Sequence, residues 1–175
     1  RWMHYFNKNW TMAASVETPQ SQVGYDNVTT SKVDDWAPNI ATFGQYSWGS
    51  NQHLRLSGIM RLLPYHDMIN ESNEHKIGWG VQLSSIIRPT NSITLYATGN
   101  IGCGYGSMTG DLIMGNYDLL NNPNSHGDMY APKSFAWYGA MQYNFRPNLF
   151  ATATFGQERL LPQYKVSGNT YKYGL

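Results

Sequence analysis

Apolar and polar residues alternate with a period of two over long stretches of this chain, and this pattern constrains its fold more than any other feature. From His53 to Leu63, the even-numbered residues are apolar or small, whereas most odd-numbered residues are polar. The same alternation recurs in residues 76–87, 92–102 and 134–145. Successive side chains of a β-strand point to opposite faces of a sheet, so the pattern predicts long strands with one apolar face. Helical spacing is not sustained over comparable lengths, although residues 110–122 suit a short helix within a loop.

Short polar turns alternate with long connections between these strands. The short turns are expected at 7–9, 49–52, 88–91 and 146–148, and the long segments at 18–38, 64–75, 105–133 and 161–170. Outer-membrane barrels have short turns at one end and long loops at the other. Strands of roughly 8 to 13 residues also suit the ~9 to 11 residues that cross a bilayer at a tilt. We therefore predict an all-β chain of about eight to nine strands in a transmembrane antiparallel up-and-down barrel.

The composition agrees with a surface that is not fully aqueous. Charged residues make up only 13% of the 175 residues, whereas aromatic residues reach 14%. No apolar run approaches the ~18 to 20 residues of a membrane-spanning helix, which excludes a helical membrane protein but not a barrel. A formal net charge of +1 gives no reason to expect a nucleic acid as partner.

Aromatic residues gather near the expected strand ends, as in the girdles that membrane barrels place at the lipid headgroups. Those beside the short turns are Phe6, Trp10, Tyr46, Trp48, Tyr143 and Phe145, and those nearer the long segments are Trp36, Tyr65 and Tyr130. Two such clusters predict two girdles.

Motifs of catalysis and of metal binding are missing from the sequence. Cys103 is the only cysteine, the five histidines lie at no metal-ligand spacing, and no GxSxG elbow occurs. The glycines from Gly102 to Gly106 superficially suggest a phosphate-binding turn, but no amphipathic helix follows them. We interpret them as a flexible exit from a strand, and we expect no enzyme activity, metal or cofactor.

If the apolar faces contact lipid, the opposite faces line a lumen. The candidate pore-lining residues are Glu17, His53, Arg55, Arg61, Lys76, Gln82, Tyr96, Tyr138, Gln142 and Arg159. With Arg1 and Glu158 included, the charged residues assigned to the lumen are mostly basic, which favours small anions. Strict alternation places Arg159 toward lipid, so only a bulge would turn it inward.

Several stretches together resemble the DcaP-like trimeric porins of Gram-negative outer membranes. They follow the order of that family over nearly the whole chain: WTMAASVETP, APNIATFGQYSW, HLRLSGIMRLLPY, IGWGVQLSS, ITLYATGNIGCGYGSMTGDL, SFAWYGAMQYNFRPNLFATATFGQERL and YKYG. The resemblance implies a 16-stranded homotrimeric barrel that passes small anions such as dicarboxylates. It also implies that Arg61 faces the channel and that Arg159 turns inward.

The members of that family are roughly twice as long and begin with a coiled-coil segment. The resemblance thus implies that residues 1–175 are an interior part of a single outer-membrane barrel domain. The expected function is passive diffusion in the outer membrane, amid lipid and lipopolysaccharide, with residues 105–133 as the constriction loop. Two alternatives remain: a small closed eight-stranded barrel with an anchoring or adhesion role, and a soluble β-sandwich that binds carbohydrate.

Overall fold

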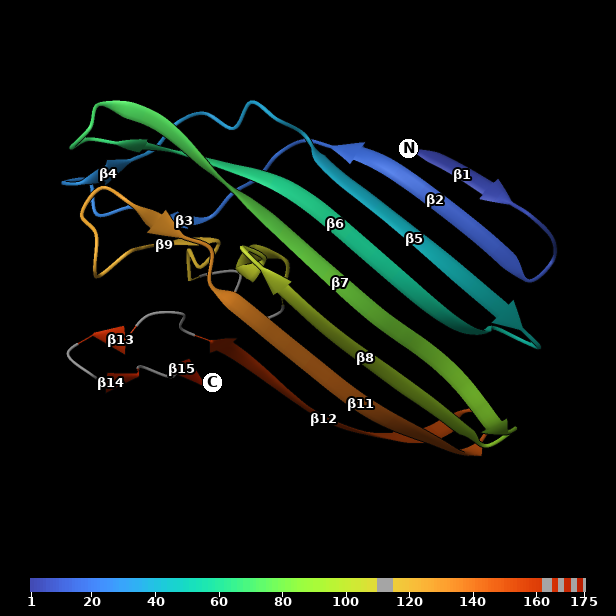
Figure 1. Cartoon of the computed structure of the whole chain (residues 1–175). Helices are drawn as coiled ribbons and strands as arrows, with labels where there is room; N and C mark the ends of the chain where they lie inside the picture. The colour runs from blue at the N-terminus through green and yellow to red at the C-terminus, as the bar shows by residue number, and fades with distance from the viewer. Residues whose placement is uncertain (110–114, 162–164, 167–168, 171–172, 175) are drawn as a thin grey trace.

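One antiparallel sheet dominates the computed structural model, which describes residues 1–109, 115–161, 165–166, 169–170 and 173–174. Its strands are β1 (Trp2–Tyr5), β2 (Trp10–Glu17), β5 (Asn39–Trp48), β6 (Gln52–Asp67), β7 (Ser72–Thr90), β8 (Ile93–Cys103), β11 (Lys133–Arg146), β12 (Leu149–Leu161) and β15 (Tyr173–Gly174), hydrogen-bonded in that order (Figure 1). Each inner strand of this order therefore pairs with the preceding and the following one, which confirms the expected up-and-down arrangement. Within the described residues the sheet is not closed, because β1 and β15 form its two edges.

Four tight hairpins join the strands at one end of the sheet, as the sequence predicts. The first depends on an asparagine, because the Asn7 side-chain oxygen accepts hydrogen bonds from the backbone N–H groups of Asn9 and Trp10. The second contains two left-handed residues, Gly49 with φ +54° and Asn51 with φ +60°. Both residue types tolerate such backbone angles, so the local sequence fixes these turns.

The prediction of a long connection over residues 64–75 is wrong, because the two strands extend into this segment from both sides. Strand β6 reaches Asp67 and β7 begins at Ser72, which leaves a turn of residues 68–71. The Asp67 carboxylate accepts the backbone N–H groups of Ile69 and Asn70, at 2.8 and 3.2 Å, and so closes this turn. The two strands lose their apolar alternation here, yet the ladder persists because β4 (Thr30–Ser31) also pairs with β6.

The other long connections assemble a small sheet of their own beside the main one (Figure 1). Strands β3 (Val23–Gly24), β9 (Leu119–Asn121) and β10 (Met129–Tyr130) form it, and β3 runs parallel to β9. A hydrophobic core lies between this sheet and the C-terminal part of β6. Its buried members are Val23, Leu63, Tyr65, Leu119, Met129 and Ala131. Two segments that are far apart in sequence are thereby joined on one side of the main sheet.

Two further expectations are wrong. Tyr65 is 2% exposed within this core, so it belongs to no headgroup girdle. The helix expected over residues 110–122 is also wrong where the structure describes it, since 115–118 form turns and a bridge and β9 follows; residues 110–114 lie outside the described residues. The last expected long segment, 161–170, is described only in part, by β13 (Lys165–Val166) and β14 (Asn169–Thr170).

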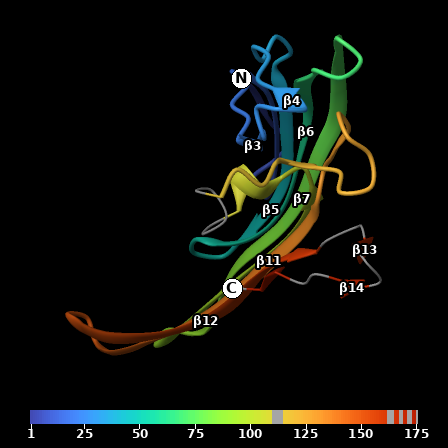
Figure 2. The same cartoon turned by 90° about the vertical axis from the view of Figure 1, so that its left-hand side faces the viewer.

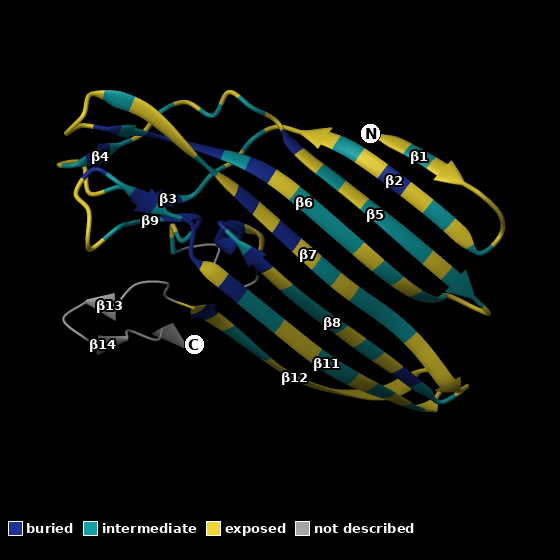
Figure 3. Cartoon of the chain, viewed as in Figure 1, coloured by how far each residue is buried: buried dark blue, intermediate teal, exposed yellow. Residues whose placement is uncertain are grey.

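One face of the main sheet carries exposed apolar side chains along most of its strands, and we call it the apolar face. Each of the following is at least 42% exposed: Val16, Ile40, Leu56, Met60, Ile77, Trp79, Leu83, Ile101, Trp137, Met141 and Phe155. The alternation of exposed and less exposed residues is visible along the strands in Figure 3. Contiguous apolar surface of this kind marks a contact with lipid or with another protein. No helix in the described residues is long and apolar enough to cross a membrane.

Candidate lumen face and its anchored loop

The opposite face of the main sheet carries polar and small side chains, and we call it the loop face. Directly paired residues of antiparallel strands share a face, and the pairs Ser57 with Gln82 and Gln82 with Asn100 continue this face across β6, β7 and β8. By the same register, the loop face includes the predicted pore-lining residues Glu17, His53, Arg55, Arg61, Lys76, Gln82, Tyr96, Tyr138 and Gln142. Figure 2 shows the short 3-10 helix η1 (Gly106–Met108) on the side toward which the sheet curves.

Arg55 is held in a fixed orientation on the loop face. Its guanidinium donates two hydrogen bonds to the side-chain oxygen of Gln45, at 2.8 and 2.6 Å. The same group lies 4.6 Å from the centre of the Phe43 ring, a cation–π distance. Both partners are uncharged, so the positive charge of Arg55 is oriented without being neutralised.

Polar residues from several strands meet elsewhere on this face. Tyr96 donates a hydrogen bond to Gln142, which in turn donates to Asn144. An open hollow brings Gln82 and Tyr138 together with Glu158. These groups offer donors and acceptors along one surface, as a hydrated channel lining does.

Arg61 differs from the expectation of a channel-facing cation. It lies on the loop face, but it is only 2% exposed because the loop between β8 and β11 covers it. Its guanidinium lies 3.1 Å from the buried carboxylate of Asp118 and donates to the Ser107 hydroxyl at 2.9 Å and to the backbone oxygen of Gln20. Arg61 therefore attaches the loop to the sheet.

Lys76 makes a second ion pair with the same connection. Its ammonium lies 2.9 Å from Asp128, which also accepts hydrogen bonds from Tyr65 and Asn122. Partial burial disfavours the charge of Asp128, but the hydrogen bonds from Lys76 and Asn122 outweigh it and lower the pKa of this carboxyl. Both ion pairs thus fix the loop that begins after β8.

Tyr105 anchors the start of this loop against two glycines. A Cβ built on Gly80 would lie 2.5 Å from the Tyr105 ring, and one built on Gly102 would lie 2.7 Å from its Cβ. Those two glycines are directly paired across β7 and β8, so they leave a flat stretch of backbone against which the ring packs. The segment from Gly102 to Gly106 is therefore a packed anchor, which corrects the interpretation of a flexible exit.

Arg159 lies on the other side of the sheet from its predicted position. It pairs with Phe135 in an unbroken stretch of β11–β12 register, and the one irregularity of that pairing lies at Asn144 and Arg146. Without a bulge it keeps the parity of Phe155 and therefore belongs to the apolar face. With the amide of Gln157 turned to present its oxygen, that oxygen accepts two hydrogen bonds from Arg159, at 3.1 and 2.8 Å.

The charge balance of the loop face also differs from the strand-based expectation. Asp118 neutralises Arg61 and Asp128 neutralises Lys76, so two of the basic residues assigned to the lumen are each paired with a carboxylate. Sequence alternation missed both aspartates because it assigns faces only within strands, and these two residues lie in a loop. The described residues contain no cluster of three His, Cys, Asp or Glu residues that could hold a metal ion.

Comparison with known proteins agrees with this architecture. No protein-family model and no curated protein matches the chain. Its structure is similar to the crystal structure of the outer membrane channel DcaP of Acinetobacter baumannii, with a TM-score of 0.69 and 14% sequence identity. The match covers 91% of this chain and 42% of that channel, so the chain spans less than half of the channel's length. At this identity the likeness shows a shared porin-like β-barrel fold and does not assign the chain to the DcaP family.

Proposed function

We propose that this chain forms part of the wall of an outer-membrane channel through which small hydrophilic solutes diffuse passively. The observation that carries this proposal is the contrast between the two faces of one sheet. The apolar face exposes large side chains such as Leu56 and Ile77, whereas the loop face carries polar groups and an anchored loop. A sheet with these faces suits lipid on one side and water on the other. Passive diffusion requires neither catalysis nor a cofactor.

The complete assembly is proposed from the resemblance noted above. It comprises a 16-stranded barrel and a homotrimer in the outer membrane of a Gram-negative bacterium, in contact with lipopolysaccharide. The structural similarity to an outer membrane channel supports the barrel and its membrane setting. In this proposal, strands beyond the present chain complete the wall.

A preference for small anions, including dicarboxylates, is the finer part of the proposal. We assign it to Arg55, because its guanidinium is oriented by the uncharged groups of Gln45 and Phe43. Arg61 contributes little to it, since Asp118 neutralises this buried cation. A fixed positive charge beside a narrow water-filled path lowers the barrier for anions.

Replacing Arg55 with glutamine in the full protein tests the anion preference. The reversal potential in a planar bilayer under a salt gradient reports the ratio of anion to cation permeability. We expect R55Q to lower this ratio by roughly two- to fivefold, the effect of a charge contribution of about 0.5–1 kcal/mol. Lys32→Gln is the matched control, because Lys32 is an exposed cation outside the barrel strands.

Three results would contradict the proposal at different levels. An unchanged reversal potential for R55Q would remove the anion preference but leave passive diffusion. Protein that inserts without conducting would instead favour a closed barrel with an anchoring role. Stable solubility without detergent would favour the carbohydrate-binding sandwich.

A further inference from the structure

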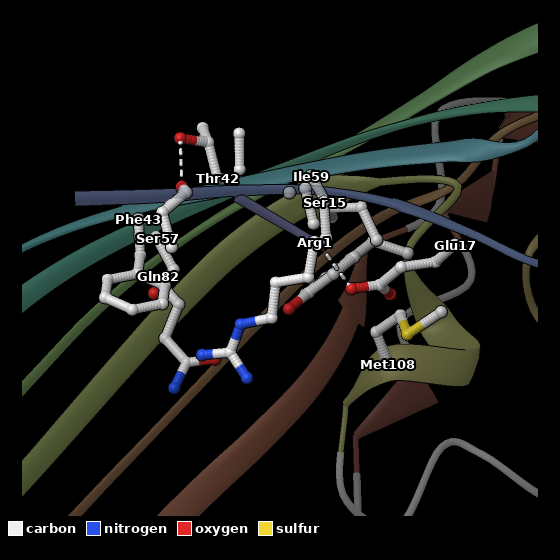
Figure 4. Close-up of a pocket in the computed structure, with 15 residues that line it drawn as sticks. Arg1, Ser15, Glu17, Thr42, Phe43, Ser57, Ile59, Gln82 and Met108 are labelled. Atoms are coloured by element: carbon white, nitrogen blue, oxygen red, sulfur yellow. Dashed lines mark hydrogen bonds between the residues drawn. The ribbon is translucent and has the colours of Figure 1, made fainter. Parts of the chain in front are cut away.

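A cavity of about 300 Å³ lies on the loop face, between η1 and strands β2, β5, β6 and β7 (Figure 4). Small residues line the side of the cavity formed by the sheet. Ala13, Ala41, Ser57 and Gly80 place little or no side chain in the cavity. The loop closes one side of the cavity through Tyr105 and η1. The space therefore exists because the loop is anchored over a patch of small residues.

Apolar side chains form much of the wall. Ile59 projects from β6, Phe43 from β5, and Met108 from η1, where Met108 remains 38% exposed. Thioether and aliphatic groups favour apolar ligand surface over water. A purely hydrated ion gains nothing from such a wall, so the cavity suits a solute with an apolar frame.

Opposite charges border the same cavity. Figure 4 shows the Arg1 side chain reaching toward Gln82, whereas Glu17 lies on the side of Met108. The Ser15 hydroxyl donates a 2.7 Å hydrogen bond to the Glu17 carboxylate and so helps to orient it. In the part of the chain that the structure describes, Arg1 and Glu17 form no ion pair within 4.0 Å with each other or with another residue. Both charges are thus left to interact with a solute.

We propose that this cavity is a binding site for small zwitterions with an apolar frame, the chemical class of an apolar amino acid. The ligand carboxylate contacts Arg1 and the Gln82 amide, its ammonium contacts Glu17, and its side chain lies against Ile59 and Met108. The proposal rests on the proposed channel function and names a solute class for it. It is separate from the anion preference assigned to Arg55, which does not line this cavity, because Glu17 favours a ligand that carries an ammonium group.

Three probes that share one branched apolar frame test the proposal: leucine, 4-methylpentanoate and leucinamide. Leucine carries both charges at neutral pH, whereas the acid lacks the ammonium and the amide lacks the carboxylate. Their binding to the full protein is measured as a concentration-dependent reduction of ion current in planar bilayers. We expect leucine to bind at least threefold more tightly than either analogue, as two partly solvated charge contacts allow.

Glu17→Gln identifies the ammonium contact. We expect E17Q to weaken leucine binding about threefold while leaving 4-methylpentanoate unweakened. Arg1→Gln is expected to weaken leucine and the acid alike, because both present a carboxylate. Glu74→Gln is the matched control, since Glu74 also accepts a hydrogen bond from a serine two residues earlier but does not line the cavity.

The possible failures are distinguishable. If the wild-type protein conducts ions but binds leucine no better than 4-methylpentanoate, the zwitterion site is wrong and the channel function stands. The same holds if E17Q and E74Q reduce leucine binding equally. If the protein forms no conducting pore at all, the proposed function fails first.

Discussion

At the scale of single residues, charges rather than hydrophobic contacts alone hold the loop to the sheet. Asp118 accepts hydrogen bonds from Arg61, from the backbone N–H of Ser107 and from that of Gln22. These donors come from β6, from η1 and from the connection after β2, so a single carboxylate joins three segments. Because Arg61 and Asp118 are both buried, loss of either partner leaves an uncompensated charge away from water.

The first prediction concerns this buried pair. Replacing Arg61 with methionine removes the cation and leaves Asp118 buried without its counter-charge. We expect the free energy of loop opening to fall by about 3–5 kcal/mol, while the barrel strands keep their stability. Hydrogen exchange of the amides in 105–109 and 115–122, compared with those in β7, measures the two effects separately.

The controls for this experiment separate charge from packing. Arg61→Met combined with Asp118→Asn removes both charges, and we expect it to recover part of the lost protection. Arg88→Met changes an exposed arginine at a short hairpin and is expected to leave the loop unaltered. Equal protection of the loop in wild type and R61M would contradict the role assigned to the pair.

At the scale of elements, the position of the loop depends on a pair of facing glycines. Gly80 and Gly102 lie side by side on β7 and β8, and the Tyr105 ring covers both. A glycine in the interior of a strand weakens that strand. The close approach of the Tyr105 ring explains why glycines occupy these two positions. Because Tyr105 immediately precedes the short 3-10 helix η1, the packing of its ring fixes where η1 projects over the loop face.

The second prediction concerns the packing of Tyr105 against these two glycines. A valine at Gly80 would place its Cβ within 2.5 Å of the Tyr105 ring, so the ring and the start of the loop must move. We expect G80V to cost about 1–3 kcal/mol through overpacking and to raise single-channel conductance as the loop withdraws. Conductance in planar bilayers and the temperature of heat denaturation measure both effects.

Gly58→Val supplies the matched control. Gly58 lies on the apolar face, where an added Cβ has the Gly80 backbone oxygen at 3.8 Å, an ordinary contact. The substitution adds the same apolar volume to a neighbouring strand without touching the loop. If both variants raised conductance equally, strand distortion rather than loop displacement would be the cause.

The sequence predicted the strand faces well but not the contacts of the loop. Alternation is a local property, so Arg55, Gln82 and Tyr138 could be assigned to one face from their spacing alone. The partners of Arg61 and Lys76 could not, because Asp118 and Asp128 reach them from 57 and 52 positions away in the chain. A usable signal existed in the paired small residues at Gly80 and Gly102, which leave room for an incoming side chain.

Two further predictions were wrong for the same physical reason. The strands continue through residues 64–75 because tertiary contacts with β4 and the loop core replace the apolar alternation that usually marks a strand. Arg159 stays on the apolar face because β12 contains no bulge beside it. Propensity and resemblance describe the average environment of a residue, whereas pairing with a particular neighbour decides its face.

At the scale of the whole molecule, one sheet carries two chemically different faces. The apolar face exposes aromatic pairs near its short-turn end, with Trp10 and Tyr46 at 5.0 Å and Tyr143 and Phe145 at 4.8 Å. Such rings suit the boundary between lipid and water. The opposite face is partly covered by a loop subdomain with its own core, so in the proposed channel the loop as well as the strands would shape the path for solutes.

The last prediction tests which environment each face contacts. Leu56 and Ser57 are adjacent on β6 and point to opposite faces, so cysteines placed there differ only in orientation. With Cys103 replaced by serine as background, we expect a charged, membrane-impermeant thiol reagent to label S57C in the membrane-embedded protein and to leave L56C unlabelled. Labelling of both in the detergent-denatured chain controls for reactivity. Because a thiolate must form in water to react, equal labelling of both native variants would mean that the apolar face is not against lipid and that the channel assignment is wrong.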